Sequence, residues 1–253
     1  MDILIYLIGG ILAGMATGLV GLSAATIIAP LFATFLGMDP FVAVGIALAS
    51  DVFASAISSG HYIKNKNINL KDAYLLGGII LAFVILGSIL SQNTNPYNLN
   101  STLNIFVVIL GIRFLVYPVK DRGSSKIMQL KRYKIPQIII WGIVIGLISG
   151  FFGAGGGLSI LAVLTMLLGY GLKNGVGTSV FIMTFVALVG AITHFVVKDT
   201  IPLAVVITSI SALVGANFAS MYANKINEVK LNRVIGVFLI LFGTSLILVF
   251  YIQ

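Results

Sequence analysis

The sequence predicts an all-α polytopic membrane protein made of two homologous helical halves. The chain is 59% hydrophobic and only 9% charged, whereas a soluble domain of this size carries about 25% charged residues. Its mean hydropathy is +1.12, and its apolar runs are long enough to span a bilayer as helices. These runs lack the alternating ten-residue pattern of an outer-membrane barrel. The glycine pattern of the first half returns in the second half.

Ten apolar segments follow one another, so we expect 8 to 10 membrane segments. They cover residues 3–22, 24–37, 41–62, 72–91, 102–118, 136–152, 157–170, 175–197, 203–222 and 232–251. The second and seventh segments hold about fourteen residues each, about 21 Å of helix, whereas a full span needs about twenty residues. We expect these two to be short broken or re-entrant helices. The first segment lacks a basic leader and a cleavage site, which favours a span over a removable signal peptide.

A basic linker at 119–135 separates the two transmembrane repeats, 1–118 and 136–253. Matching residues recur at a constant offset of 132, which becomes 133 at the histidines: Gly10, Gly14, Gly18 and Gly21 match Gly142, Gly146, Gly150 and Gly153, and His61 matches His194. Chance similarity between apolar segments would not keep this register, so the sequence predicts a duplication. An odd number of crossings per half would make the halves inverted repeats, as in many transporters.

The basic residues favour an odd number of crossings. If each half crosses five times, 13 of the 15 Lys and Arg residues lie on one side, with Lys198 and Arg113 as the exceptions. If the short segments return to the same side, the distribution weakens to 10 against 4, again without Arg113. Basic loops are retained in the cytoplasm, so we expect a cytoplasmic linker and both termini outside. The net charge of +8 then fits contact with anionic lipid heads, not with nucleic acid.

The stretch Gly150-Phe-Phe-Gly-Ala-Gly-Gly-Gly157 interrupts the helical pattern inside apolar sequence. Glycine weakens a helix interior, and a broken backbone inside a membrane must be covered by protein or line a watery cavity. We expect half-helices that begin near Ser23 and Gly155 to approach the midplane from opposite faces. Their N-termini would then be directed at one small anion. Alternatively, the glycines only allow helices to pack closely.

The predicted substrate-binding residues belong to both breaks and to the helix after the second break. They are Gly21, Ser23, Thr26, Gly153, Gly155, Gly156, Gly157, Thr178 and Ser179. The hydroxyl groups would add hydrogen-bond donors for an oxyanion. Alternatively, each hydroxyl bonds a carbonyl oxygen of its own helix.

Asp51, His61 and His194 are candidates for coupling or gating. Asp51 lies about ten residues inside an apolar segment, where a carboxylate is costly and by default marks a proton relay or ion site. The histidines stand at equivalent segment ends. They are either interfacial caps or groups that handle protons near neutral pH.

No catalytic constellation is visible, and we expect no enzyme activity, no cofactor and no metal. The glycine cluster lacks the strand–helix context of a dinucleotide-binding fingerprint. The two histidines are far apart and have no carboxylate pair nearby. The chain contains no cysteine, which excludes disulfides and thiolate metal sites.

These features resemble the TauE/SafE family of membrane permeases, the sulfite exporter family. The resemblance rests on the cluster at 150–157, on Gly177-Thr-Ser179, on His194, and on the first-half version from Gly18 to His61. It implies a duplicated helical permease for sulfite, for sulfonates such as taurine or sulfoacetate, or for related sulfur anions. The chain departs from the family pattern at 23–25, at 46–47 and at Ala162, which leaves the substrate open.

The leading hypothesis is a permease of the cell membrane that moves a small anion, a sulfur oxyanion or organosulfonate, by alternating access. Coupling to protons or another ion would act through Asp51. The alternatives are an anion channel and a membrane-embedded interaction subunit without transport. Saturable exchange would indicate a carrier, and unitary currents would indicate a channel. The direction of transport and the oligomeric state stay open.

Overall fold

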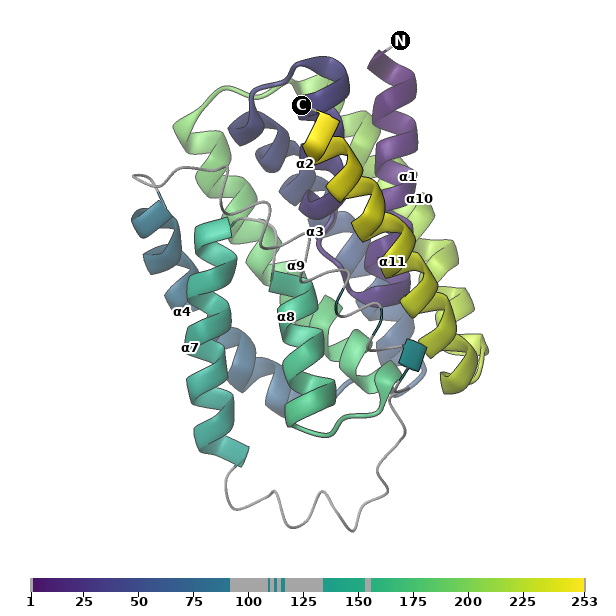
Figure 1. Cartoon of the computed structure of the whole chain (residues 1–253). Coiled ribbons are helices and arrows are strands. Elements are labelled where there is room, and N and C mark those ends of the chain that lie inside the picture. The colour runs from purple at the N-terminus through teal and green to yellow at the C-terminus, as the bar shows by residue number, and fades with distance from the viewer. Residues whose placement is uncertain are drawn as a thin grey trace.

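The computed structural model describes residues 2–91, 109, 112, 115–116, 134–152 and 156–252. These residues form a helical bundle, which confirms the all-α fold class (Figure 1). Its elements are α1 (Asp2–Val20), α2 (Ala25–Leu36), α3 (Pro40–Lys64), α4 (Leu70–Ser91), α7 (Lys134–Phe152), α8 (Gly156–Ala162), the π-helix η2 (Val163–Leu167), α9 (Leu172–Val197), α10 (Pro202–Lys225) and α11 (Glu228–Ile252). Most of the predicted segment 102–118 and most of the linker 119–135 lie outside the described residues.

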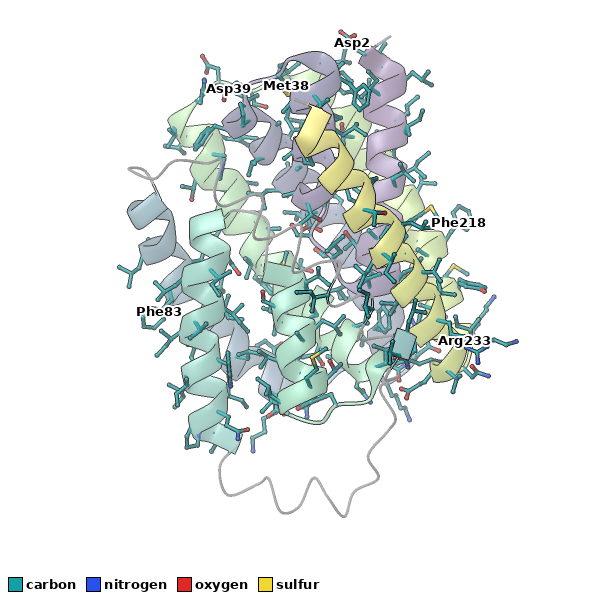
Figure 2. All side chains as sticks on the ribbon, in the orientation of Figure 1. Asp2, Met38, Asp39, Phe83, Phe218 and Arg233 are labelled. Carbon is teal, nitrogen blue, oxygen red and sulfur yellow. The ribbon has the colours of Figure 1, made fainter. Side chains whose placement is uncertain are left out.

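The described helices suit a lipid environment. Five of them are long and apolar enough to cross a membrane: α1, α3, the part of α4 from Leu70 to Gly87, α9 and α10. As predicted, α2 and the continuous α8–η2 segment (Gly156–Leu167) are too short for a full span. Large apolar side chains face outwards, such as Phe218 of α10, which is 67% exposed and projects away from the bundle (Figure 2). The protein is a multi-pass integral membrane protein.

The two short helices run in opposite directions. α1 begins at the end of the bundle that holds Asp2, and α2 returns to this end, where Tyr6 and Phe32 pack with ring centroids 5.1 Å apart. The α8–η2 segment leads to the opposite end, where Tyr170 donates a hydrogen bond to Asp72 at the start of α4. Each short helix therefore reaches from the interior to a different end of the bundle (Figure 1).

Basic residues of the described helices gather at one end of the bundle. Lys173 Nζ donates to the Asn224 carbonyl oxygen at 2.8 Å and joins the start of α9 to the end of α10. At the other end, Lys198 pairs with Asp39 at 2.8 Å. Figure 2 shows Asp2 and Asp39 at one end and Arg233 towards the other. Which end faces the cytoplasm stays a prediction.

Glycines allow two pairs of helices to approach closely. A Cβ on Gly14 would collide with the Ala212 carbonyl oxygen, which shows how tightly α1 lies along α10. A Cβ on Gly146 would lie 2.8 Å from the Ile80 carbonyl oxygen, so α7 lies along α4 in the same way. Small residues permit such contacts in membrane bundles. These two equivalent pairs are what a duplicated chain would produce, although the duplication itself stays a prediction.

Candidate functional site

The first break separates α1 from α2 between Gly21 and Ala24. Gly21 has φ +72°, a left-handed conformation that glycine adopts without steric cost, and α1 ends there. The Ser23 hydroxyl oxygen accepts from the Ala25 N–H at 3.4 Å. The Thr26 hydroxyl donates to the Ser23 carbonyl oxygen at 2.6 Å. Both predicted hydroxyls therefore bond within the turn that opens α2.

The second break leads into α8, which begins at Gly156. The predicted residues Gly153 and Gly155 lie outside the described residues. Gly156 lies beside Ser149 near the end of α7 and beside Met183 in α9. The Ser149 hydroxyl is buried and has no hydrogen-bond partner among the described residues. Because the first turn of a helix leaves N–H groups without partners in that helix, hydrogen-bond donors gather at this point.

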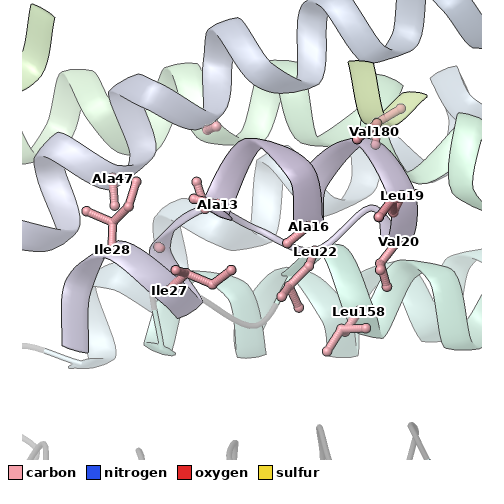
Figure 3. Close-up of a cluster of buried hydrophobic side chains, with 14 of the residues drawn as sticks. Ala13, Ala16, Leu19, Val20, Leu22, Ile27, Ile28, Ala47, Leu158 and Val180 are labelled. Carbon is pink, nitrogen blue, oxygen red and sulfur yellow. The ribbon is translucent and has the colours of Figure 1, made fainter. Parts of the chain in front are cut away.

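The two breaks are in direct contact. A Cβ on Gly157 would collide with the Gly21 carbonyl oxygen and would lie 3.1 Å from the Ser23 backbone nitrogen. The Ser179 hydroxyl donates to the Gly157 carbonyl oxygen at 2.9 Å, and Ser179 also packs against Gly21. The structure thus brings four predicted residues together: Gly21, Ser23, Gly157 and Ser179. Figure 3 shows the buried apolar side chains around this contact, which include Leu22, Leu158 and Val180.

Thr178 faces a different set of partners, at the basic end of the bundle. Its hydroxyl oxygen accepts from the Asn69 N–H at 3.2 Å. The Asn69 side chain donates to Asp72 and to the Tyr170 hydroxyl, at 3.0 Å each. Thr178 therefore belongs to a network that joins the loop before α4 to the segment after η2.

Among the described residues, the two histidines have their partners outside the breaks. The His61 Nε2 lies 2.8 Å from the Asn217 Oδ1 and joins α3 to α10. His194 stacks on Phe41 with ring centroids 4.3 Å apart, and its Nδ1 lies 2.8 Å from the Gly190 carbonyl oxygen. Their roles in gating stay predictions. No group of three or more His, Cys, Asp or Glu side chains in the described part of the chain could hold a metal ion.

Asp51 reaches the first break from the centre of α3. Its side chain is fully buried, and the Thr17 hydroxyl lies 3.2 Å from Oδ1. The Ser23 hydroxyl and the Ala24 N–H face the same carboxyl group. Oδ2 has no partner within hydrogen-bond geometry among the described residues. The carboxyl group therefore occupies the N-terminal end of α2, where an anion is favoured.

Two further residues at the breaks, Thr17 and Ser149, are not among those that the sequence predicted. They stand 132 residues apart, the offset of the predicted repeat, and each precedes a break glycine by four residues. A comparison of hydroxyl positions between the halves, in addition to glycines and histidines, would have found them. The contact of Thr17 with Asp51 joins residues that are 34 positions apart, so it depends on the folded arrangement.

Comparison of the sequence with known proteins identifies a family. The family profile described as sulfite exporter TauE/SafE matches residues 6–246. YunE of Bacillus subtilis is 23% identical over 98% of both chains. MJ0441 of Methanocaldococcus jannaschii is 29% identical over 75% of this chain and 71% of its own. YfcA of Escherichia coli is 29% identical over 51% of this chain and 48% of its own.

All three relatives are named as probable membrane transporter proteins. The profile match spans nearly the whole chain. This chain belongs to the sulfite exporter TauE/SafE family.

Proposed function

We propose that this protein is a membrane permease that moves a small anion, a sulfur oxyanion or organosulfonate, by alternating access. Membership of the sulfite exporter family and the names of the relatives support transport. The interior contact between two oppositely directed half-helices supports a binding site near the midplane, the place that transporters with broken helices use.

The observation that carries this proposal is the buried Ser149 hydroxyl beside the start of α8. It has no hydrogen-bond partner among the described residues, although buried polar groups are normally paired. Gly156 lies directly against it, and the α8 N-terminus adds backbone N–H donors and a positive dipole end. Hydrogen-bond donors that lack an acceptor suit a small oxyanion, which presents several acceptor oxygens.

The α2 N-terminus differs from the α8 N-terminus. Asp51 lies at the start of α2, whereas Met183 stands 132 residues later and lies beside Gly156. The first half therefore supplies its own carboxyl group, and the described residues place no carboxylate at the start of α8. We assign the substrate anion to the α8 side of the contact, with Ser179 holding the backbone at Gly157.

The proposal is tested by anion flux into proteoliposomes that contain the purified protein. Sulfite, thiosulfate, sulfate, sulfoacetate and taurine are compared as labelled substrates and as competitors. We expect saturable uptake and accelerated exchange with at least one sulfur anion. Ser149→Ala is expected to weaken transport at least about tenfold, because a hydrogen bond to a charged group contributes about 1.5–3 kcal/mol.

Ser58→Ala is the matched control, because the buried Ser58 hydroxyl donates to the Ala54 carbonyl oxygen of its own helix. Its flux should stay near the wild-type value. Unitary currents without saturable exchange would indicate the channel alternative. Folded protein without flux of any of these anions would contradict the proposal and favour the interaction subunit.

A further inference from the structure

We propose that Asp51 is a proton-binding group that couples transport to protons, so that the anion and one proton bind together. This inference rests on the proposed anion transport. Asp51 stands in the middle of the 25-residue α3, a helix of about 37 Å, and therefore near the midplane. Its side chain is 0% exposed, and an ionisable group at this depth requires a partner or a change of charge.

The Thr17 hydroxyl has more acceptors around it than hydrogens to donate. The Thr17 Oγ1 lies 2.8 Å from the Leu22 carbonyl oxygen, 3.1 Å from the Ala13 carbonyl oxygen and 3.2 Å from the Asp51 Oδ1. A hydroxyl group donates only one hydrogen. If Thr17 donates to Leu22, its shortest contact, an ionised Asp51 presents a second acceptor to the same oxygen. A protonated Asp51 donates to Thr17 and turns this contact into a hydrogen bond.

In the part of the chain that the structure describes, no charged side chain compensates Asp51. The helices packed on α3 are α1, α2, α9 and α10. Apart from Asp51, the titratable or charged side chains of these five helices are Asp2, Tyr6, His61, Tyr62, Lys64, Lys173, His194, Tyr222 and Lys225. None of them acts on the Asp51 carboxyl group. Tyr62, which reaches the adjacent turn of α1, donates to the Gly18 carbonyl oxygen instead.

A proton fits these surroundings better than a metal cation. The Ala13 and Leu22 carbonyl oxygens and Asp51 Oδ1 surround the Thr17 hydroxyl. The Ser23 hydroxyl and the Ala24 N–H face the carboxyl group from the start of α2. The positive end of this helix opposes a cation, whereas a proton needs only the carboxyl group and one acceptor oxygen.

The contact between the breaks links this proton to the substrate. The Ser23 hydroxyl and the Ala24 N–H face the Asp51 carboxyl group. The Ser23 backbone also packs against Gly157 in the first turn of α8. An anion at the α8 N-terminus and an ionised Asp51 would therefore be like charges on two sides of one buried contact. Such charges repel strongly where water is excluded. A proton on Asp51 removes this repulsion, and by reciprocity the anion favours protonation.

The test is proton uptake on anion binding by the purified wild-type protein in weakly buffered detergent solution. Thiosulfate is the probe because it carries no exchangeable proton near neutral pH. Across pH 5 to 10 we expect proton uptake that reaches about one proton per thiosulfate, and a dissociation constant that rises about tenfold per pH unit where Asp51 is ionised. Asp51→Asn is expected to bind thiosulfate without proton uptake and without this pH dependence.

In proteoliposomes, an imposed pH gradient should drive thiosulfate accumulation by the wild type. Asp51→Asn should exchange thiosulfate but lose this accumulation, and Asp39→Asn, at an exposed carboxylate, should retain it. If Asp51→Asn does not fold, Thr17→Val replaces it and should shift the pH at which binding is half-maximal.

Binding of thiosulfate without proton uptake at any pH would overturn the inference and leave the anion site standing. A requirement for Na⁺ that Asp51→Asn abolishes would also overturn it, in favour of a metal cation. If no sulfur anion binds or is transported, the proposed function fails first, and this coupling fails with it.

Discussion

Gly157 in the first turn of α8 packs directly against the carbonyl group of Gly21, with no room for a side chain between the two backbones. Gly157→Ala should therefore separate the half-helices. Overpacking of this kind typically costs about 1–3 kcal/mol, and we expect a lower melting temperature in detergent together with loss of anion flux.

Gly60→Ala is the matched control for this variant. Gly60 lies within α3, and a Cβ there meets nothing within 4 Å. Since alanine forms helices better than glycine, its melting temperature should be equal or higher. If Gly157→Ala were as stable and as active as Gly60→Ala, the close contact between the breaks would be wrong.

Ser179 stabilises the same contact through its hydrogen bond to the Gly157 carbonyl oxygen. Ser179→Ala leaves a buried acceptor without this donor, which should cost about 1–3 kcal/mol. The expected result is a lower melting temperature, and lower anion affinity because the α8 backbone is held less firmly. Ser179→Thr, which keeps the hydroxyl, should recover part of both; equal behaviour of Ala and Thr would show that the hydrogen bond is unimportant.

Tyr170 closes the network at the basic end by donating to Asp72, while Asn69 donates to both side chains. Tyr170→Phe removes one donor to a buried carboxylate, so we expect a loss of about 1–3 kcal/mol. Faster proteolysis of the segment between η2 and α9 should accompany the lower melting temperature. Tyr222→Phe, at a position that is 51% exposed, should change neither measurement.

The Asp39–Lys198 pair predicts a small dependence of stability on pH. The hydrogen bond from Lys198 chiefly holds the pKa of Asp39 below its usual value, and the N–H groups of Val42 and Phe41 add to this. A lowered folded-state pKa stabilises the fold above pH ~3.9 and loses this effect as pH falls through the lowered pKa. The pair is half exposed, so about 1 kcal/mol or less is expected.

Asp39→Asn isolates the charge of this pair, because Asn is an equally good N-cap for α3. Its melting temperature should lie slightly below the wild-type value at pH 7 and converge on it as the pH falls through the lowered pKa of Asp39. A difference that grows as the pH falls would have the wrong sign for this account.

The sequence predicted the helices and the two breaks because apolar runs and glycine clusters are local signals. Segments 24–37 and 157–170 correspond to α2 and to α8–η2 within about three residues at each end. The alternative interpretation, that glycines allow helices to pack closely, also holds at Gly14 and Gly146, which face neighbouring helices. Close packing and a helix break thus occur in the same glycine pattern, a few turns apart.

The partners of the polar groups could not be predicted in the same way. Thr178 and Ser179 are neighbours in sequence, yet Ser179 bonds the second break and Thr178 bonds the loop before α4. Which face of α9 meets which segment is decided by packing between distant parts of the chain. Asp51 was found from its cost in an apolar segment, whereas its contact with Thr17 became apparent only in the folded arrangement.

The most direct test of the anion site is ligand stabilisation of the purified protein. Sulfite, sulfate, thiosulfate, sulfoacetate and taurine are compared with chloride at matched ionic strength. A ligand at 100 times its dissociation constant stabilises the native state by about 2.7 kcal/mol, which is visible as a melting shift. We expect a selective shift with a sulfur anion that is strongly reduced in Ser149→Ala and retained in Ser58→Ala. The absence of a shift with every sulfur anion, or an equal shift in both variants, would contradict it.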